Sequence, residues 1–401
     1  MTLREGWDTR PLGECLAIPA GYGANAPSID YSPSLPRYLR ITDIGDEGQI
    51  IDENKRSISP EDANGCFLED GDVVFARTGA TVGKTYLHRK SRDPIAFAGY
   101  LIRFRVDREL LNPDFLFQYC QSPAYWAWVA LMSRAGAQPN INAGEYSSLR
   151  LPLPPVTEQN AIVAVLSAWD RGIRQLSDLI AAKLRFKQGL MQQLLTGKRR
   201  FKEFRGNLVS ASLGDIVDFV NGRAFKPSEW KSAGLPIIRI QNLNGSTEYN
   251  HFDGLYDDKH LVRPGDLLFS WSGSRGTSFG SFFWHGPEGL LNQHIFRVLP
   301  RSTVGKRYIG HVLRYVTGII ETKAHGSAGL VHVTKRELEK FHIDFSDNLD
   351  EQDRVATVLD NADHEIDLLR KELDALKTQK KGLMQKLLTG QVRVKLPKGG
   401  A

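Results

Sequence analysis

The amino-acid sequence predicts an α+β protein in which two mixed α/β domains alternate with two long helices, the second half of the chain repeating the first. The repeat is the strongest observation, because GLMQQLLTG at 189–197 recurs as GLMQKLLTG at 382–390, 193 positions later. At the same offset, Glu158-Gln159 matches Glu351-Gln352. A constant offset over roughly forty residues indicates a duplicated element, and the period is too long for a solenoid. The chain is therefore expected to use one domain-sized unit twice.

Two stretches of the sequence carry the heptad pattern of helices that pair side by side. Their apolar positions are Ile162, Leu166, Trp169, Ile173, Leu176, Ile180, Leu190 and Leu194 in the first, and Val355, Leu359, Ala362, Ile366, Leu369, Leu373, Leu376, Leu383 and Leu387 in the second. Lys183 and Lys187 interrupt the first seam, and Lys380 interrupts the second. Each stretch ends at Thr-Gly, where Gly197 and Gly390 suit a left-handed helix cap. Neither helix can bury its seam alone, so we expect the two to form an antiparallel coiled coil.

The segments around these helices have no long periodic run, and they align loosely with each other. Strand-like residues follow Gly71-Asp72 in one segment and Gly265-Asp266 in the other. Framework positions agree, whereas the stretches between them differ, as two domains with two different ligands would require. We expect a first domain at 1–153, a helical spacer at 154–198, a second domain at 199–347, and a second spacer with a C-terminal tail at 348–401.

Composition limits the class of protein. The chain has 401 residues, 41% hydrophobic and 24% charged, which are globular values, and it shows neither a membrane-spanning run nor a signal peptide. Three scattered cysteines (Cys15, Cys66 and Cys120) fit a reducing cytoplasm and predict no metal site. Between Val156 and Gly206, ten basic residues face four acidic ones, so this stretch carries the whole formal charge of +6. A solvated helix face or a polyanionic partner such as nucleic acid accounts for it equally well.

Several motifs together resemble the specificity subunits of type I restriction–modification systems. They are the Pro-Leu-Pro-Pro…Glu-Gln entry at 152–159, the Leu-Leu-Thr-Gly exits, the Gly-Asp turns at 71 and 265, and the crossover from Arg200-Phe201 to Phe204-Arg205-Gly206. The resemblance covers nearly the whole chain. One departure is visible, since the second helix is entered through Ile343-Asp344-Phe345-Ser346 where the first has Leu153-Pro154-Pro155. We expect this to alter the local turn and not the role.

The resemblance implies a non-catalytic DNA-recognition subunit. Each α/β domain would be a target recognition domain that reads one half of a split, asymmetric site in double-stranded DNA. The two helices would set the distance between the halves and dock two methyltransferase subunits, with restriction and motor subunits joining the assembly. The family's assembly methylates adenine and cleaves unmodified DNA, so S-adenosylmethionine, ATP and Mg are expected on the partner subunits and no cofactor on this chain.

The sequence itself also indicates that the catalytic sites lie on other subunits. Holding a flipped adenine requires polar and aromatic side chains around a Pro-Pro pair, whereas Pro154-Pro155 is flanked by Leu153 and Val156. The stretch Gly79–Thr85 resembles a phosphate-binding loop but has three residues between its glycines instead of four. A strand-like segment follows it, where phosphate binding needs a helix. We expect a glycine-rich hairpin that touches DNA phosphates through Arg77, Thr78 and Lys84.

Direct readout of bases needs Arg, Lys, Asn, Gln, Ser or Thr at the base edges. Two equivalent loops, 134–142 and 323–335, precede the two long helices and supply such residues, as does the glycine-containing region near 272–276. A basic run at the end of the first helix is expected to contact the phosphate backbone. Besides the hairpin residues, the predicted DNA contacts are Arg134, Gln138, Asn140, Asn142, Lys198, Arg199, Arg200, Ser272, Ser274, Arg275, Lys323, Ser327, His332 and Lys335.

Two alternative functions stay open at the level of sequence. The chain is equally compatible with the specificity subunit of a related type II or standalone methyltransferase system. The other alternative is a coiled-coil interaction protein without a DNA role. A gel shift on random-sequence DNA with a salt titration separates this alternative from both kinds of specificity subunit.

Overall fold

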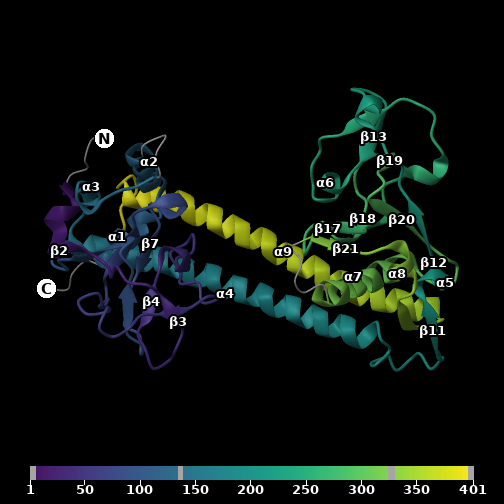
Figure 1. The fold of residues 1–401 in the computed structure, drawn as a ribbon, viewed down its shortest axis with the longest axis horizontal. Coiled ribbons are helices and arrows are strands. Elements are labelled where there is room, and N and C mark those ends of the chain that lie inside the picture. The colour runs from purple at the N-terminus through teal and green to yellow at the C-terminus, as the bar shows by residue number, and fades with distance from the viewer. Residues whose placement is uncertain (1–5, 134–138, 324–329, 396–401) are drawn as a thin grey trace. The chain divides into compact units, whose positions relative to one another are not determined.

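A computed structural model describes residues 6–133, 139–323 and 330–395. They form two compact units (Figure 1): one combines residues 1–177 with 371–401, and the other is the continuous stretch 178–370. Each unit contains one α/β domain, the first part of one long helix and the last part of the other. The ranges predicted from the sequence follow the order of the elements along the chain. The compact units differ from them in that each unit includes about half of each long helix. No helix in the described part of the chain is long and apolar enough to cross a membrane.

The first unit contains two four-stranded sheets and a short ribbon. One sheet has the order β2 (Leu16–Tyr22), β9 (Leu101–Val106), β6 (Val73–Ala76) and β7 (Thr85–Leu87). The other has the order β3 (Ile29–Asp30), β5 (Arg56–Ser57), β4 (Arg37–Leu39) and β8 (Ile95–Phe97). The ribbon pairs β1 (Asp8–Pro11) with β10 (Arg150–Leu153). Three short helices complete it, namely α1 (Pro113–Cys120), α2 (Pro123–Met132) and α3 (Ala143–Ser147).

The second unit repeats this plan with longer connections. Its first sheet has the order β12 (Val217–Asn221), β20 (Ile295–Pro300), β16 (Leu267–Ser270) and β18 (Gly280–Phe283). The second has the order β14 (Asn250–Phe252), β13 (Leu235–Ile238), β19 (Gly289–Leu291) and β15 (Leu261–Val262). Two ribbons pair β11 (Leu208–Ser212) with β22 (His342–Ser346), and β17 (Ser272–Ser274) with β21 (Leu330–His332). Its helices are α5 (Leu213–Ile216), α6 (Ile240–Leu243), α7 (Lys306–Lys323) and α8 (Lys335–Glu339).

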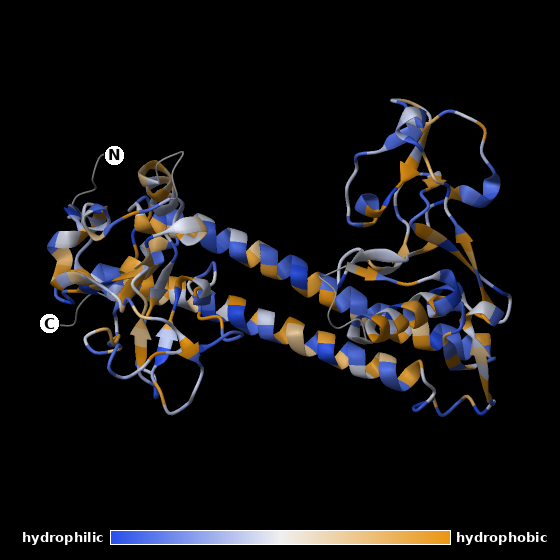
Figure 2. Ribbon diagram, viewed as in Figure 1, coloured by the Kyte–Doolittle hydropathy of each residue, from blue (hydrophilic) through white to orange (hydrophobic). Residues whose placement is uncertain are grey.

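The two long helices are α4 (Val156–Leu194) and α9 (Leu349–Leu388), close to the predicted ranges. Apolar and polar bands alternate along both (Figure 2), as the heptad pattern requires. Every predicted seam position is buried or half-buried. Gly197 and Gly390 have φ of 67° and 69°, which confirms the predicted left-handed caps. The helices themselves end two or three residues earlier, at Leu388 and Leu194.

The lysines that interrupt the seams form ion pairs. In the first unit, Lys380 Nζ lies 2.5 Å from Asp170 Oδ1. In the second unit, Lys187 forms the equivalent ion pair with Asp363. Within the first unit, Glu158 near the start of α4 also pairs with Arg393 beyond the end of α9. The paired positions therefore move in opposite directions along the chain, so the helix segments within that unit run antiparallel.

The Glu-Gln pair at the start of each long helix anchors the helix to its α/β domain. In the first unit, buried Gln159 donates from Nε2 to the carbonyls of Leu110 (2.9 Å) and Pro154 (2.8 Å). In the second, buried Gln352 donates to the carbonyls of Thr303 (3.0 Å) and Ser346 (2.8 Å). The altered entry therefore keeps its role, as expected. It differs only in that the carbonyl acceptor lies six residues before the glutamine instead of five.

Each unit has its own apolar core, into which the ends of both long helices pack. In the first unit, Phe75, Tyr125 and Tyr146 lie at the centre, and Met384, Leu387 and Leu388 of α9 join them. In the second, Met191 in the last turn of α4 and Leu195 just after it join the core beside Val355 and Leu359 of α9. Because burial of apolar side chains is the main stabilising term in folding, each unit depends on chain segments contributed by both long helices.

Candidate nucleic-acid interface

The glycine-rich stretch after β6 is a hairpin, as the sequence predicted. Gly79–Thr81 form one turn of 3-10 helix, and the chain then enters β7, which pairs antiparallel with β6. No long helix begins here, so the loop lacks the row of amide donors that a nucleotide-binding loop presents. Of the predicted phosphate contacts, Arg77 and Thr78 are half-buried at the end of β6. Lys84 already forms an ion pair with Asp46, at 2.7 Å.

The hairpin meets the segment that precedes α3. Thr78 forms a β-bridge with Asn140, and the Gly79 amide donates to the carbonyl of Pro139 at 2.9 Å. The Arg77 guanidinium lies over the ring of Tyr22, 5.0 Å from its centroid, and its Nε donates to Asn140 Oδ1 at 3.4 Å. The structure thus joins two predicted contacts, Arg77 and Asn140, across 63 residues of sequence.

The second unit builds the same junction with β17 and β21, where Ser272 pairs with His332 and Ser274 with Leu330. The ring of Trp271 stands beside His332, with 4.9 Å between ring centroids, and beside His294, with 5.2 Å. Ser274, the last residue of β17, and Arg275, in the turn that follows, are both exposed. Ser272, Ser274 and His332, predicted from two separate stretches of sequence, therefore lie on neighbouring strands.

Other predicted contacts have structural partners. Asn142 caps α3, where its side chain accepts from the Glu145 amide at 2.9 Å. Lys335 donates from Nζ to the carbonyl of Phe219 at 2.7 Å. Arg134, Gln138 and Ser327 lie outside the described residues, as does the side chain of Lys323 at the end of α7. For these last four residues, the prediction stands as it was made.

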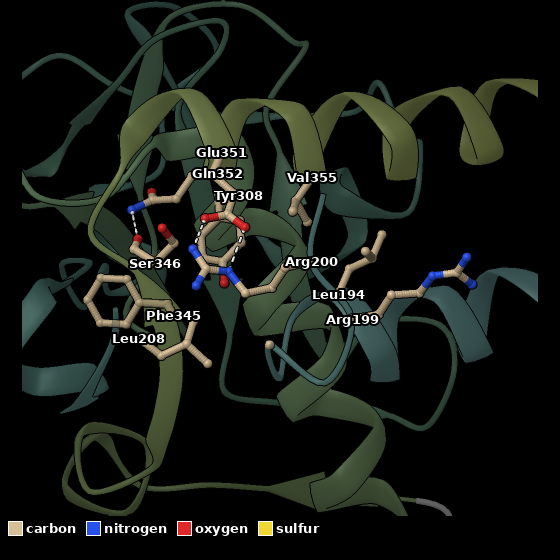
Figure 3. A pocket seen from close by; sticks show the side chains of 11 residues that line it. Leu194, Arg199, Arg200, Leu208, Tyr308, Phe345, Ser346, Glu351, Gln352 and Val355 are labelled. Carbon is tan, nitrogen blue, oxygen red and sulfur yellow. Dashed lines mark hydrogen bonds and ion pairs between the residues drawn. The ribbon is translucent and has the colours of Figure 1, made fainter. Parts of the chain in front are cut away.

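The basic run after α4 divides into two kinds of residue. Lys198 and Arg199 are exposed, and the Arg199 side chain extends away from Arg200 and Glu351 (Figure 3). Arg200 turns inward, where its Nη2 and Nε lie 2.5 and 2.9 Å from the two carboxylate oxygens of Glu351. It also donates to the carbonyl of Gly206. A guanidinium that is held by a buried carboxylate has a structural role, so Arg200 leaves the set of expected phosphate contacts.

One cluster has donors of the kind that bind metals. His311 Nε2 lies 2.8 Å from Asp360 Oδ1, and Asp363 is close by. However, Asp360 also pairs with Arg307 (2.6 Å), and Asp363 pairs with Arg314 (2.6 Å) and with Lys187. Three cationic side chains already neutralise two carboxylates, so the charge balance of this cluster does not call for a cation. Burial lowers the pKa of His311 below its ordinary value, which keeps its imidazole neutral near pH 7.

Sequence reasoning missed the aromatic side chains at the junctions, namely Tyr22, Tyr100, Trp271 and His294. Tyr22 and Tyr100 are exposed, and Trp271 is half-buried. The alignment of the two halves of the sequence could have identified these residues. Each stands at the end of a strand of the shared framework or immediately beside one, at a position where the halves carry different residues.

Comparison with known proteins supports the resemblance seen in the sequence. Residues 5–183 and 207–378 each match the family described as the type I restriction modification DNA specificity domain. The chain is 27% identical to the putative type I restriction enzyme MjaX specificity subunit of Methanocaldococcus jannaschii, covering 98% of this chain and 95% of that protein. It is 24% identical to the EcoKI specificity subunit of Escherichia coli strain K12, covering 76% of this chain and 69% of that one.

Two solved structures have a similar fold. One comes from work on complex assembly and conformational transition of the type I R-M system, with a TM-score of 0.62, 21% identity, and coverage of 98% of this chain and all of that one. The other is the S subunit of a type I restriction–modification system from M. genitalium, with a TM-score of 0.56, 15% identity, and coverage of 97% and 98%. At these identities, the likeness concerns the fold.

Proposed function

Because this chain belongs to the family of type I restriction–modification DNA specificity subunits, we propose that it reads a bipartite, asymmetric site in double-stranded DNA, one half with each unit. Within such a system it is the recognition subunit, and the chemistry is carried out by its partners. The observation that carries the bipartite reading is the duplicated junction, in which the strand framework recurs while the side chains on it differ. A duplicated frame with different contact residues suits two different half-sites.

The two long helices act as the spacer between the half-sites, forming an antiparallel coiled coil along their length. This part of the proposal is supported by the seam positions, which are buried or half-buried in both helices, and by the ion pairs Lys187–Asp363 and Lys380–Asp170. The 39 residues of α4 correspond to about 58 Å of helix, at 1.5 Å per residue.

The partners follow from the same family role. Two methyltransferase subunits dock on the helical spacer, and motor subunits join them for cleavage. S-adenosylmethionine, ATP and Mg are bound by those partners, and this chain supplies the DNA contacts. The three cysteines are free thiols, and two of them are buried. This agrees with a protein that binds DNA in a reducing compartment of the cell.

Mapping of methylated adenines tests the proposal. The full chain is co-expressed with its methyltransferase subunit in a host that lacks adenine methylation, and the genome is read by single-molecule sequencing. We expect methylation at one motif made of two different specified parts separated by an unspecified gap. A single continuous motif, or methylation without sequence preference, would contradict the bipartite reading. A gel shift of the purified chain, alone and with the partner, on random-sequence DNA across a salt series checks DNA binding directly.

A further inference from the structure

The residue that follows β6 in the first unit and the residue that follows β16 in the second make equivalent backbone hydrogen bonds. We call this shared set of backbone hydrogen bonds the frame. In the first unit, the Arg77 amide donates to the carbonyl of Tyr100 at 3.1 Å, and the Arg77 carbonyl accepts from the Ile141 amide at 2.9 Å. In the second unit, the Trp271 amide donates to the carbonyl of His294 at 3.3 Å, and the Trp271 carbonyl accepts from the Val333 amide at 3.0 Å. Both hydrogen bonds are duplicated, yet arginine stands at one position and tryptophan at the other.

A third backbone hydrogen bond of the frame occurs in both units. The Gly23 amide donates to the carbonyl of Leu101 at 3.3 Å, and the Gly222 amide donates to that of Ile295 at 3.1 Å. A Cβ atom at Gly23 would lie 2.2 Å from a backbone oxygen, and one at Gly222 would lie 2.1 Å from another, so both positions admit only glycine. The frame therefore holds the preceding residue, Tyr22 or Asn221, at one fixed place in each unit.

The side chains on this frame have different chemistry in the two units. In the first, Tyr22 holds the Arg77 guanidinium by a cation–π contact, and the Tyr22 hydroxyl accepts from the Ala143 amide at 3.1 Å, which fixes the ring. Asn140 accepts from Arg77 Nε. No carboxylate in the described part of the chain pairs with Arg77. Among the described residues its two terminal nitrogens have no acceptor, so their donors remain for an external partner, while the Tyr22 ring and Asn140 hold the guanidinium.

In the second unit, the same position presents an apolar ring. Trp271 Nε1 is its only donor, and it is used by the carbonyl of Gln293 at 3.0 Å. The imidazoles of His294 and His332 flank the ring, and both are exposed. This position can offer stacking, contact with a methyl group, and the two ring nitrogens of each imidazole. It cannot form the bidentate fork of a guanidinium.

Building on the proposed function, we propose that this position determines the specificity of each unit, and that Arg77 recognises a guanine in the half-site of the first unit. A guanidinium whose plane is fixed matches the two acceptors, O6 and N7, that guanine presents in the major groove. The group of Trp271, His294 and His332 recognises a different base in the other half-site, for which the thymine methyl is the best match to an apolar ring. One frame with two side-chain sets therefore reads two different base edges.

The test uses the full chain with its methyltransferase subunit and three variants: Arg77→Ala, Arg77→Lys, and His294→Ala with His332→Ala. For each, methylation of the mapped motif and of its single-base substitutions is measured by competition. Wild-type complex should prefer guanine at one position of one half-site by about 10- to 100-fold, and Arg77→Ala should abolish most of that preference. Arg77→Lys should weaken the preference while leaving affinity for random DNA unchanged, because it keeps the charge but lacks the planar fork of the guanidinium. The double histidine variant should alter preference in the other half-site only.

The matched control is Arg92→Ala, because Arg92 is an exposed arginine of the same unit outside the frame, and its removal should leave every preference unchanged. If Arg77→Ala kept the guanine preference, or if both Arg77 variants weakened all sequences alike, Arg77 would not read the base and this inference would be wrong while the bipartite function stood. A wild-type complex without any sequence preference would instead overturn the proposed function itself.

Discussion

At the scale of single residues, the two repeats bury the same carboxylate in the same way. Glu158 and Glu351 occupy equivalent positions, and each receives an arginine from beyond the end of a long helix, Arg393 and Arg200 respectively. The hydrogen bonds from Arg200 hold the pKa of Glu351 below its ordinary value. A carboxylate with a lowered pKa in the folded state stabilises the fold above its unfolded pKa, and this contribution is lost as pH falls through the folded pKa.

Glu351→Gln should therefore lower stability at pH 7 by about 1–3 kcal/mol, because a buried charge-assisted pair becomes a neutral contact. The difference in Tm between the wild type and the variant should be largest at neutral pH. It should shrink as the pH falls below about 4.3, the pKa of an unfolded glutamate, and on through the lower pKa of folded Glu351. Thermal unfolding between pH 3 and pH 7 measures it. Glu372→Gln, an exposed position on the same helix, is the control and should show no such trend. A Tm difference that did not change with pH would contradict the charged pair.

The exposed pair Lys198 and Arg199 is expected to contact DNA phosphates. Lys198→Ala with Arg199→Ala should weaken binding to specific and random DNA by similar factors, because phosphate contacts carry no sequence information. Each lost contact should lower the slope of log affinity against log salt by about 0.9, so the double variant should lose about 1.8. Binding across a salt series measures both. Lys381→Ala with Lys386→Ala removes two exposed lysines from α9 as a control. An unchanged slope, or a loss confined to the specific site, would refute the contact.

At the scale of elements, sequence periodicity located the two long helices well, because the heptad pattern is local and repeats many times. The lysines at 187 and 380 could be seen only as interruptions of the seam. Their partners, Asp363 and Asp170, lie 176 and 210 residues away, and nothing local to either lysine identifies them. The same limit affected Arg200, whose partner Glu351 is 151 residues distant. Local patterns thus predict elements, whereas partners of charged side chains depend on the completed fold.

Heptad insertion tests the spacer. Seven residues added after Leu176 and seven after Leu369 keep the seam in register and lengthen each helix by about 10.5 Å. Both insertion points fall at the boundaries between the compact units. At about 3.4 Å per base pair, the unspecified gap in the methylated motif should grow by about three base pairs. An insertion in α4 alone is the control, since it has no matching length in α9 and should abolish specific methylation. An unchanged gap in an active double insertion would rule out the spacer role.

At the scale of the whole molecule, two units on one framework predict that specificities can be exchanged. Replacing residues 207–347 with the matching domain of a relative should change one half of the methylated motif and leave the other half intact, because each unit has its own core and its own junction. Methylome mapping of the chimaera gives the result, and replacement by the domain from an enzyme of identical specificity is the control. A change in both halves would show that the units do not read independently.

The split composition of the first unit has a consequence for the order in which the protein is made. The second unit is continuous in sequence, so all of its residues are translated before residue 371. The first unit starts earlier in the sequence but lacks Met384, Leu387 and Leu388 of its core, together with the Arg393 partner of Glu158, until residues 384–393 are translated. The domain synthesised first is therefore the one completed last, and a chain that stopped near residue 370 would carry a finished second unit beside a first unit with an open core.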